Sequence, residues 1–172
     1  MKCKSIVFIL FLWCLALPGR GQAEERDFSA KENAASAQAS SAPADAKGIV
    51  WRSYEEGLRQ GKNEKKKIFL NFYADWCQYC KIMDMQTFRD RSVVNYLNEN
   101  FVAVRVNSDQ NRKLAADYKV TGLPVSWFVA ENGESIGSQP GFLPPETLLP
   151  LLKYISTDSY KKMNFRQFME KM

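Results

Sequence analysis

The chain has 172 residues, a formal net charge of +5 and no histidine. This length allows one globular domain with appendages. The positive charge is small, and no run of Arg and Lys is interleaved with aromatic residues, so we expect no nucleic-acid partner.

Residues 1–23 have the pattern of an export signal. Lys2 and Lys4 precede an apolar stretch from Ile6 to Leu17, and Gly21-Gln-Ala23 fits a signal-peptidase site. The apolar stretch is short for a bilayer span, which favours a cleaved signal over a permanent anchor. We therefore expect a periplasmic protein, with a membrane tether formed by an uncleaved signal as the alternative. Without the signal, 21 basic residues face 19 acidic ones.

Residues 24–47 are rich in Ala, Ser, Glu and Lys, and Phe28 is their only large aromatic residue. Such a segment buries too little apolar surface to offset its ordering entropy. We predict a disordered linker over 24–47, a folded domain over 48–156 and a C-terminal extension over 157–172.

The folded part is expected to begin with a short edge strand over 49–51. Ser53 then fits the N-cap of a helix that runs to about Gln60. An apolar run from Ile68 to Tyr73 predicts a strand that is buried on both faces, as in the centre of a parallel sheet.

After this strand, Ala74-Asp-Trp76 turns the chain and Cys77-Gln-Tyr-Cys80 opens a predicted helix. Residues three apart on a helix share a face, so the two sulfurs can meet. The first sulfur would lie beside free backbone N–H groups and the positive end of the helix dipole. These groups stabilise a thiolate, which is the form that attacks disulfides. The sequence therefore predicts a redox-active dithiol.

A cysteine pair of this spacing also occurs in zinc sites and in structural disulfides. A zinc site needs four ligands, but the chain has no histidine, and Cys3 and Cys14 lie in the expected signal. We therefore predict no metal and no cofactor. A structural disulfide would close a very short loop and constrain the unfolded chain little.

The rest of the domain alternates helices and strands. We predict a helix capped by Asp90, a strand over 101–106, a short helix capped by Asp109, a strand over 125–130, and a hairpin at Asn132-Gly133 that leads to a strand over 134–137. The residues of the two helices that we expect to face inward are Val93, Val94, Leu97, Leu114, Ala115 and Tyr118. This order predicts a sheet with helices on both faces.

The last helix of the domain is expected to start at Pro144 and Pro145. Its inward-facing residues would be Leu148, Leu149, Leu151, Leu152 and Ile155. Pro150 conflicts with an unbroken helix, so we expect the helix either to start late or to bend there.

The extension repeats apolar residues near helical spacing, with basic residues between them. The apolar residues are Tyr160, Phe165, Phe168, Met169 and Met172, and the basic ones are Lys161, Lys162, Arg166 and Lys171. One interpretation is an extra helix docked on the domain. The other is a basic amphipathic surface for a partner or the membrane.

Four segments resemble the thioredoxin superfamily, and the resemblance extends from about Ile49 to Ile155. They are Tyr73-Ala-Asp-Trp-Cys-Gln-Tyr-Cys-Lys81, Val106-Asn-Ser-Asp-Gln-Asn111, Thr121-Gly-Leu-Pro124 and Pro140-Gly-Phe142. The closest resemblance is to the C-terminal thioredoxin-like domain of the DsbD family of membrane thiol:disulfide interchange reductases. It implies an α/β, thioredoxin-like fold with a mixed central sheet flanked by helices, to which the extension adds a C-terminal helix.

The resemblance also implies roles for single residues. Cys77 matches the attacking, more exposed cysteine, and Cys80 matches the resolving one. Pro124 matches a cis-proline opposite the dithiol, where the backbone of Leu123 would receive an extended peptide; a trans proline entering a strand is the alternative. Gln78 and Tyr79, between the cysteines, are the other expected substrate-binding residues. Trp76 resembles a tryptophan that covers the dithiol, although a packing aromatic fits its sequence equally well.

Three residues, Asn71, Arg105 and Asp84, differ from the residues that the family has at the same places. Asn71 stands where most thioredoxins have a buried aspartate that relays protons, and an amide cannot accept a proton. The alternative for Asn71 is a satisfied buried polar residue. Arg105 takes the place of a lysine that pairs with that aspartate. Asp84, one helical turn beyond Cys80, lies where the DsbD domain has a glutamate. We expect Asp84 to be the remaining acid that influences the dithiol, with a solvated surface residue as the alternative.

These residues favour an exported thiol:disulfide oxidoreductase that reduces protein disulfides. No histidine lies between the cysteines to stabilise the reduced form, which favours a reductant over a strong oxidant. The expected partners are protein disulfides and a membrane electron donor of the DsbD type. The alternatives are a disulfide oxidase or isomerase, and a peptide-binding or chaperone module without turnover.

Overall fold

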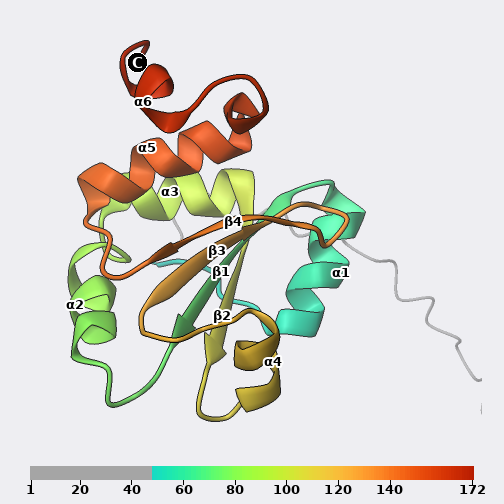
Figure 1. Cartoon of the computed structure of the whole chain (residues 1–172), viewed down its shortest axis with the longest axis vertical. Coiled ribbons are helices and arrows are strands. Elements are labelled where there is room, and N and C mark those ends of the chain that lie inside the picture. The colour runs from blue at the N-terminus through green and yellow to red at the C-terminus, as the bar shows by residue number, and fades with distance from the viewer. Residues whose placement is uncertain (1–47) are drawn as a thin grey trace, which may run out of the picture. The chain divides into compact units, whose positions relative to one another are not determined.

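A computed structural model describes residues 48–172 of the chain (Figure 1). The expected signal (1–23) and linker (24–47) lie outside the described residues. The helices are α1 (Tyr54–Glu64), α2 (Gln78–Gln86), α3 (Arg91–Asn100), α4 (Arg112–Asp117), α5 (Pro145–Ser156) and α6 (Phe165–Met169), with a 3-10 turn η1 (Ser159–Lys161). The strands are β1 (Lys67–Tyr73), β2 (Phe101–Asn107), β3 (Val125–Val129) and β4 (Ser135–Pro140).

The four strands form one mixed sheet in the order β2-β1-β3-β4. β1 runs parallel to β2 and antiparallel to β3, and β4 pairs antiparallel with β3. The prediction of a central strand from the apolar run Ile68 to Tyr73 is therefore confirmed, because β1 has a neighbouring strand on each side. The hairpin at Asn132-Gly133 is also confirmed, and Gly133 has a φ of 89°, which glycine adopts without strain.

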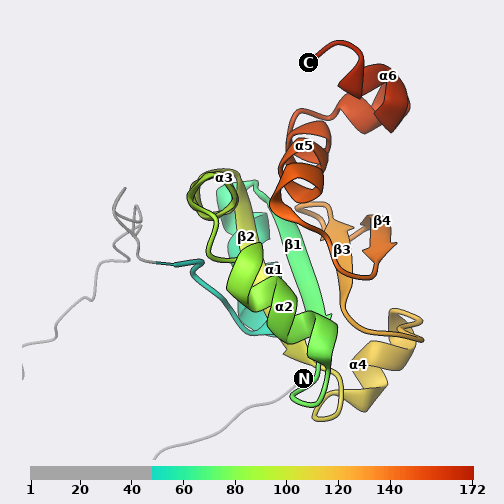
Figure 2. The same ribbon diagram turned by 90° about the vertical axis from the view of Figure 1, so that its left-hand side faces the viewer.

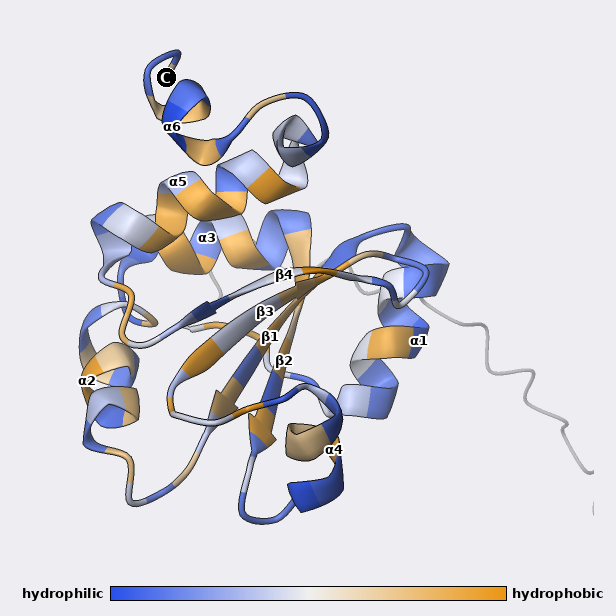
Figure 3. Cartoon of the chain, in the orientation of Figure 1, coloured by the Kyte–Doolittle hydropathy of each residue, from blue (hydrophilic) through white to orange (hydrophobic). Residues whose placement is uncertain are grey.

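Helices cover both faces of this sheet, because successive side chains of a strand point to opposite faces. On one face Phe69 packs against residues of α2, α3 and α5. On the other face Leu70 packs against residues of α1 and α4. Hydrophobic colour gathers on β1, β2 and β3 and on parts of α3 and α5, whereas β4 is mostly hydrophilic (Figure 3). The predicted α/β class with flanking helices is thus confirmed.

The predicted edge strand over 49–51 is wrong. Only Arg52 pairs with the sheet, as an isolated bridge to Val104. The Val50 N–H donates instead to the side chain of Asn98 at 3.1 Å, so the ladder cannot extend toward the N-terminus. Ile49 and Trp51 contribute by packing on the core rather than by strand pairing.

Two of the three predicted helix caps are confirmed. The side chain of Ser53 accepts from Glu56 N, and that of Asp90 accepts from Val93 N. α1 continues past the predicted end at Gln60 to Glu64. Asp109 does not cap α4, because the helix starts later and its N-cap residue is Asn111.

α5 runs from Pro145 to Ser156 through Pro150, so of the two alternatives, a late start or a bend at Pro150, the late start is wrong. In this position Pro150 removes only the hydrogen bond to a carbonyl of the first helical turn. Leu148, Leu152 and Ile155 are buried, as predicted, and Leu149 and Leu151 pack against the same core while staying partly accessible.

The extension docks on α5 through aromatic side chains. The ring of Tyr154 lies 6.4 Å from Tyr160, 5.4 Å from Phe165 and 5.3 Å from Phe168, measured between ring centroids. Its hydroxyl donates to the Met163 carbonyl at 2.6 Å.

A charged contact also ties the extension to the domain. The Asp158 carboxylate forms ion pairs with Lys67 at 3.3 Å and with Lys161 at 2.9 Å. Met169 and Met172 stay exposed. Figures 1 and 2 show α6 beyond α5, at the end of the molecule away from the start of α2. These contacts support the interpretation of a docked extra helix.

Removal of Tyr160 to Met172 is expected to lower the free energy of unfolding by about 1–3 kcal/mol, because it uncovers Tyr154 and removes three aromatic contacts. This corresponds to a fall of roughly 3–8 °C in the melting temperature, measured by circular dichroism. The double variant Met169→Ala, Met172→Ala, which alters only exposed side chains, serves as the control. An unchanged melting temperature after truncation, with loss of activity, would instead support a recognition surface.

Candidate active site

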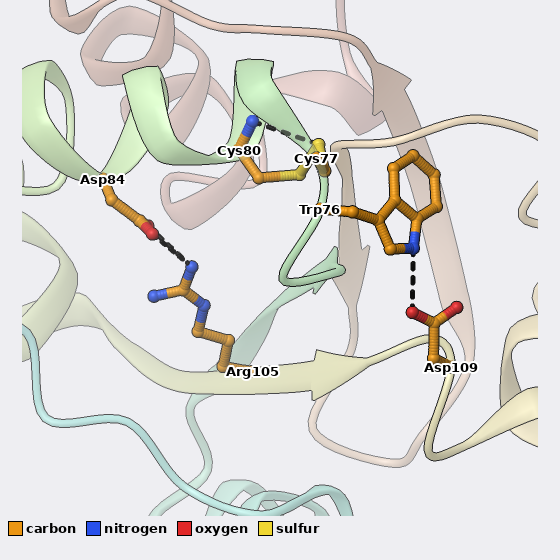
Figure 4. Close-up of a disulfide and its surroundings, with 6 residues drawn as sticks. All are labelled: Trp76, Cys77, Cys80, Asp84, Arg105 and Asp109. Atoms are coloured by element: carbon orange, nitrogen blue, oxygen red, sulfur yellow. Dashed lines mark hydrogen bonds and ion pairs between the residues drawn. A yellow bond between two sulfur atoms is a disulfide. The ribbon is translucent and has the colours of Figure 1, made fainter.

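The two cysteines lie where β1 ends and α2 begins. Cys77 is the N-cap residue of α2, and its sulfur accepts a hydrogen bond from the Cys80 backbone N–H at 3.1 Å. Cys77 Sγ and Cys80 Sγ are joined in a disulfide (Figure 4). The first turn of α2 has no acidic side chain, so within that turn no carboxylate competes with the Cys77 sulfur for the positive end of the helix. This end of the helix is suited to stabilise a negative charge on the Cys77 sulfur.

The disulfide is nearly closed to solvent. Cys77 is 4 % exposed and Cys80 is 3 % exposed, so the oxidised form shows almost no difference between the expected attacking and resolving cysteines. Both pack with Ala74, and the side chains of Tyr73 and Leu123 pack against this cluster. We call Tyr73, Ala74 and Leu123, which pack around the two sulfurs, the rim of the disulfide.

Leu123 and Pro124 bring a free stretch of backbone to this rim. The Leu123–Pro124 peptide bond is cis, and Pro124 is buried. Within residues 48–172, no backbone hydrogen bond uses the N–H or the carbonyl of Leu123. This backbone is available to an extended peptide next to the cysteine cluster.

The residues between the cysteines are accessible. Gln78 and Tyr79 form the first turn of α2, and Tyr79 is 62 % exposed. Both side chains are therefore free to touch a partner that approaches the disulfide.

Trp76 is 70 % exposed, which rules out the alternative of a core-packing aromatic. Its indole Nε1 donates a hydrogen bond to Asp109 Oδ2 at 2.8 Å. The ring stands beside Cys77 (Figure 4). Asp109, which we predicted as a helix cap, is thus a neighbour of the site, and its position two residues after the end of β2 is the signal that could have revealed this.

Arg105 pairs with Asp84 rather than with a residue of the sheet. Arg105 Nη2 lies 2.7 Å from both carboxylate oxygens of Asp84. The guanidinium carbon also lies 4.2 Å from the ring centroid of Tyr73 and 5.5 Å from that of Trp51. The Asp84 carboxylate points toward Arg105 (Figure 4). The pair ties α2 to β2, so Asp84 is not merely a solvated surface residue.

Asn71 is 1 % exposed and lies in register between Arg105 on β2 and Ser126 on β3. Within residues 48–172, neither Asn71 Nδ2 nor Ser126 Oγ has a hydrogen-bond partner. The interpretation of Asn71 as a fully satisfied polar residue is therefore wrong for its amide nitrogen. A carboxylate is absent from this buried position, and the acid that balances Arg105 comes from α2 instead.

No helix over 48–172 is long and apolar enough to cross a membrane. In the same range, no three His, Cys, Asp or Glu residues converge as the ligands of a metal ion would.

Comparisons with known proteins agree with this geometry. A family model described as a thioredoxin-like domain matches residues 54–156. The disulfide bond reductase DsbH of Chlamydia pneumoniae is 31% identical over 114 residues, which cover 58% of this chain and 69% of that protein. The thiol:disulfide interchange protein DsbD of Photorhabdus laumondii is 35% identical over 89 residues, which cover 50% of this chain but only 15% of that protein.

Solved structures show the same fold. A thioredoxin from Thermus thermophilus superposes with a TM-score of 0.58 at 28% identity, and covers 62% of this chain and 86% of its own. A DsbH oxidoreductase superposes with a TM-score of 0.54 at 24% identity, and covers 73% of this chain and 92% of its own.

Asp84→Ala is expected to lower the free energy of unfolding by about 1–2 kcal/mol, because it leaves the half-buried charge of Arg105 without its acceptor. Chemical denaturation of the oxidised protein measures this change. The matched control is Asp117→Ala, which breaks an exposed ion pair with Lys113 and should cost less than about 0.5 kcal/mol. Equal effects of the two substitutions would contradict the tie between α2 and β2.

Proposed function

The chain belongs to the thioredoxin-like domain family, and on that premise we propose that it is an exported thiol:disulfide oxidoreductase that reduces protein disulfides through Cys77 and Cys80. The observation that carries this proposal is the disulfide at the N-terminus of α2, with Cys77 as the helix cap. The names of the DsbD and DsbH relatives support the reaction class.

The first step is an attack by the Cys77 thiolate on a client disulfide. A bond forms between Cys77 Sγ and one client sulfur while the client S–S bond breaks, and the second client sulfur leaves as a thiolate. The positive end of α2 and the Cys80 N–H hold the charge on Cys77 before the attack. The Leu123 backbone would align the client strand beside the sulfurs.

The second step releases the client. Cys80 loses its proton to the departing client thiolate or to water, and its sulfur attacks Cys77 Sγ. The mixed disulfide breaks, the first client sulfur leaves as a thiolate that takes a proton, and the Cys77–Cys80 disulfide forms. Two electrons have passed to the client, which now carries two thiols. The buried, adjacent position of the two sulfurs supports this fast internal displacement.

We assign the direction of the reaction from the residues around the dithiol. The first turn of α2 carries Gln78 and Tyr79 and no histidine. A histidine there would stabilise the thiolate of the reduced form and make the disulfide a stronger oxidant, so its absence favours a reductant. One relative is named a disulfide bond reductase, which agrees with this direction.

An exported reductant must be re-reduced, because its surroundings do not supply electrons. The proposed donor is a membrane protein of the DsbD type, which would reduce the Cys77–Cys80 disulfide through the same mixed-disulfide chemistry in reverse. The pattern of residues 1–23 supports export to the periplasm. The chain spans 15% of the length of the DsbD relative described above, so the activity of that whole protein is not carried over to this chain.

Cysteine variants test the reaction. The reduced protein is expected to release thiols from insulin, and Cys77→Ser should abolish this release. Cys80→Ala should attack once and accumulate a mixed disulfide, because no second sulfur resolves it. Mass spectrometry without reducing agent measures the adduct. If the double variant Cys77→Ser, Cys80→Ser keeps the biological function, a peptide-binding or chaperone module is the correct alternative.

The reduction potential tests the direction. Equilibration with glutathione or dithiothreitol should place the Cys77–Cys80 couple closer to the roughly −270 mV of thioredoxin than to the roughly −120 mV of a strong oxidant. Quantification of the two redox forms by thiol alkylation measures the potential. A value near that of the strong oxidants would contradict the reductant and favour the oxidase or isomerase.

A further inference from the structure

Thr87 ends the redox helix with a buried hydroxyl. It is the C-cap residue of α2, the helix that begins at the dithiol, and it is 0 % exposed. Its Oγ1 donates a hydrogen bond of 2.6 Å to the carbonyl of Leu143, which lies 56 positions further along the chain. Within residues 48–172, no backbone N–H donates to this carbonyl. The hydroxyl of Thr87 is therefore the group that satisfies the Leu143 carbonyl in the core.

The segment that ends at Leu143 also holds Pro124. β4 ends at Pro140, which pairs in register with Val125, the residue after Pro124. The N–H of Gly141 then donates to the Pro124 carbonyl at 2.8 Å, and Gly141 has a φ of 87°, which glycine adopts without strain. The 141–143 segment, between β4 and α5, therefore contacts Pro124 at one end and α2 at the other (Figure 1).

The 141–143 segment has little freedom between these two hydrogen bonds. Leu143 is 4 % exposed and belongs to the core cluster that contains Met83 and Phe88, and Phe142 packs against the same cluster. Three residues of backbone span at most about 10 Å. Because packed interiors transmit displacements, a shift of Leu143 is passed on to Gly141.

Both ends of this connection lead to the dithiol. Leu123, next to Pro124, makes no backbone hydrogen bond within residues 48–172, and its side chain packs on the cysteine cluster. α2 is a single helix of nine residues, with Cys77 as the residue before its first turn and Thr87 as the residue after its last. The hydrogen bond of Thr87 therefore acts on both parts that a client disulfide has to meet, the sulfurs and the free backbone beside them.

We infer that Thr87 is a positioning residue: its hydrogen bond to the 141–143 segment sets where the backbone of Leu123 lies relative to the dithiol. A backbone that is already held in place loses less freedom when a client strand pairs with it, so the bond raises affinity for a polypeptide. Because Thr87 is buried, it acts on the client only through other residues. This effect on the client rests on the proposed function, whereas the link between Thr87 and Gly141 does not.

Three variants separate the hydrogen bond of Thr87 from its packing. Thr87→Val replaces the hydroxyl by a methyl group, and Thr87→Ser keeps the donor. Tyr96→Phe is the matched control, because the hydroxyls of Tyr96 on α3 and Ser156 on α5 form another hydrogen bond between two elements, at 2.7 Å. Ser156 contacts Lys67 at the start of β1, whereas the dithiol follows the end of β1. Melting temperatures check that all variants are folded.

Amide hydrogen exchange, followed by nuclear magnetic resonance, measures the link without any substrate. The N–H of Ser108, which donates to the Tyr73 carbonyl at 2.8 Å, is a reference amide outside the segment. In Thr87→Val, exchange at Gly141 should become about fivefold faster relative to exchange at Ser108, because the segment opens more often. Thr87→Ser and Tyr96→Phe should leave the ratio of the two rates within about twofold of that of the unsubstituted protein.

Kinetics with two substrates measure the effect on the client. For insulin reduction, Thr87→Val should raise KM by about three- to tenfold with little change in kcat, as expected for a weakened binding contact. Thr87→Ser should restore KM to within about twofold, and Tyr96→Phe should leave it unchanged. The rate with a small aromatic disulfide, which has no strand to pair with the backbone of Leu123, should be the same in all variants.

Three results would overturn the inference: an equal rise of exchange at Gly141 and Ser108 in Thr87→Val, an unchanged KM for insulin in that variant, or an equal rise of KM in Tyr96→Phe. A failure of the proposed function has a different signature. The unsubstituted protein would then reduce the small disulfide but no protein disulfide, and exchange at Gly141 would still decide whether Thr87 holds the 141–143 segment.

Discussion

The site depends on one contact, in which the sulfur of Cys77 accepts the backbone N–H of Cys80 at the start of α2. Helix caps are usually oxygen atoms of Ser, Thr, Asp or Asn. Here the capping atom is also the proposed reacting atom, so the N–H group that begins the helix also holds charge on the sulfur. β1, paired on both sides, brings the chain to this point from the centre of the sheet. The position of the dithiol therefore follows from the packing of β1.

The ion pair of Arg105 and Asp84 joins β2 to α2, and its carboxylate does not come from the sheet. The sheet presents an amide at Asn71, and the carboxylate that pairs with Arg105 comes from Asp84 on α2. The guanidinium also lies against the ring of Tyr73, which packs on the cysteine cluster. Arg105 of β2 therefore contacts α2 directly through Asp84 and reaches the cysteine cluster indirectly through the ring of Tyr73. We interpret the pair as a support for the position of α2, with the sulfurs at the other end of that helix.

Sequence reasoning succeeded where a local pattern is sufficient. The apolar run of β1, the cap at Asp90 and the turn at Gly133 all follow from short-range rules, and the structure confirms each. It failed at residues 49–51, where the amide of Asn98 takes the backbone N–H that strand pairing would need. It also failed at Asp109, a residue type that favours helix caps but here receives the Trp76 indole. Both failures involve a partner that is distant in the chain.

The amino-acid sequence alone determined the class of fold, the order of the elements from α1 to α5 and the two cysteines at the start of a helix, because spacing, apolar periodicity and turn residues are local properties. Only the tertiary structure decided which carboxylate pairs with Arg105, which loop holds Trp76 and where the aromatic residues of the extension dock. Those contacts join residues 21, 33 and up to 14 positions apart. Their partners are set by which strands become neighbours and which helix faces meet, and no short stretch of sequence contains that information.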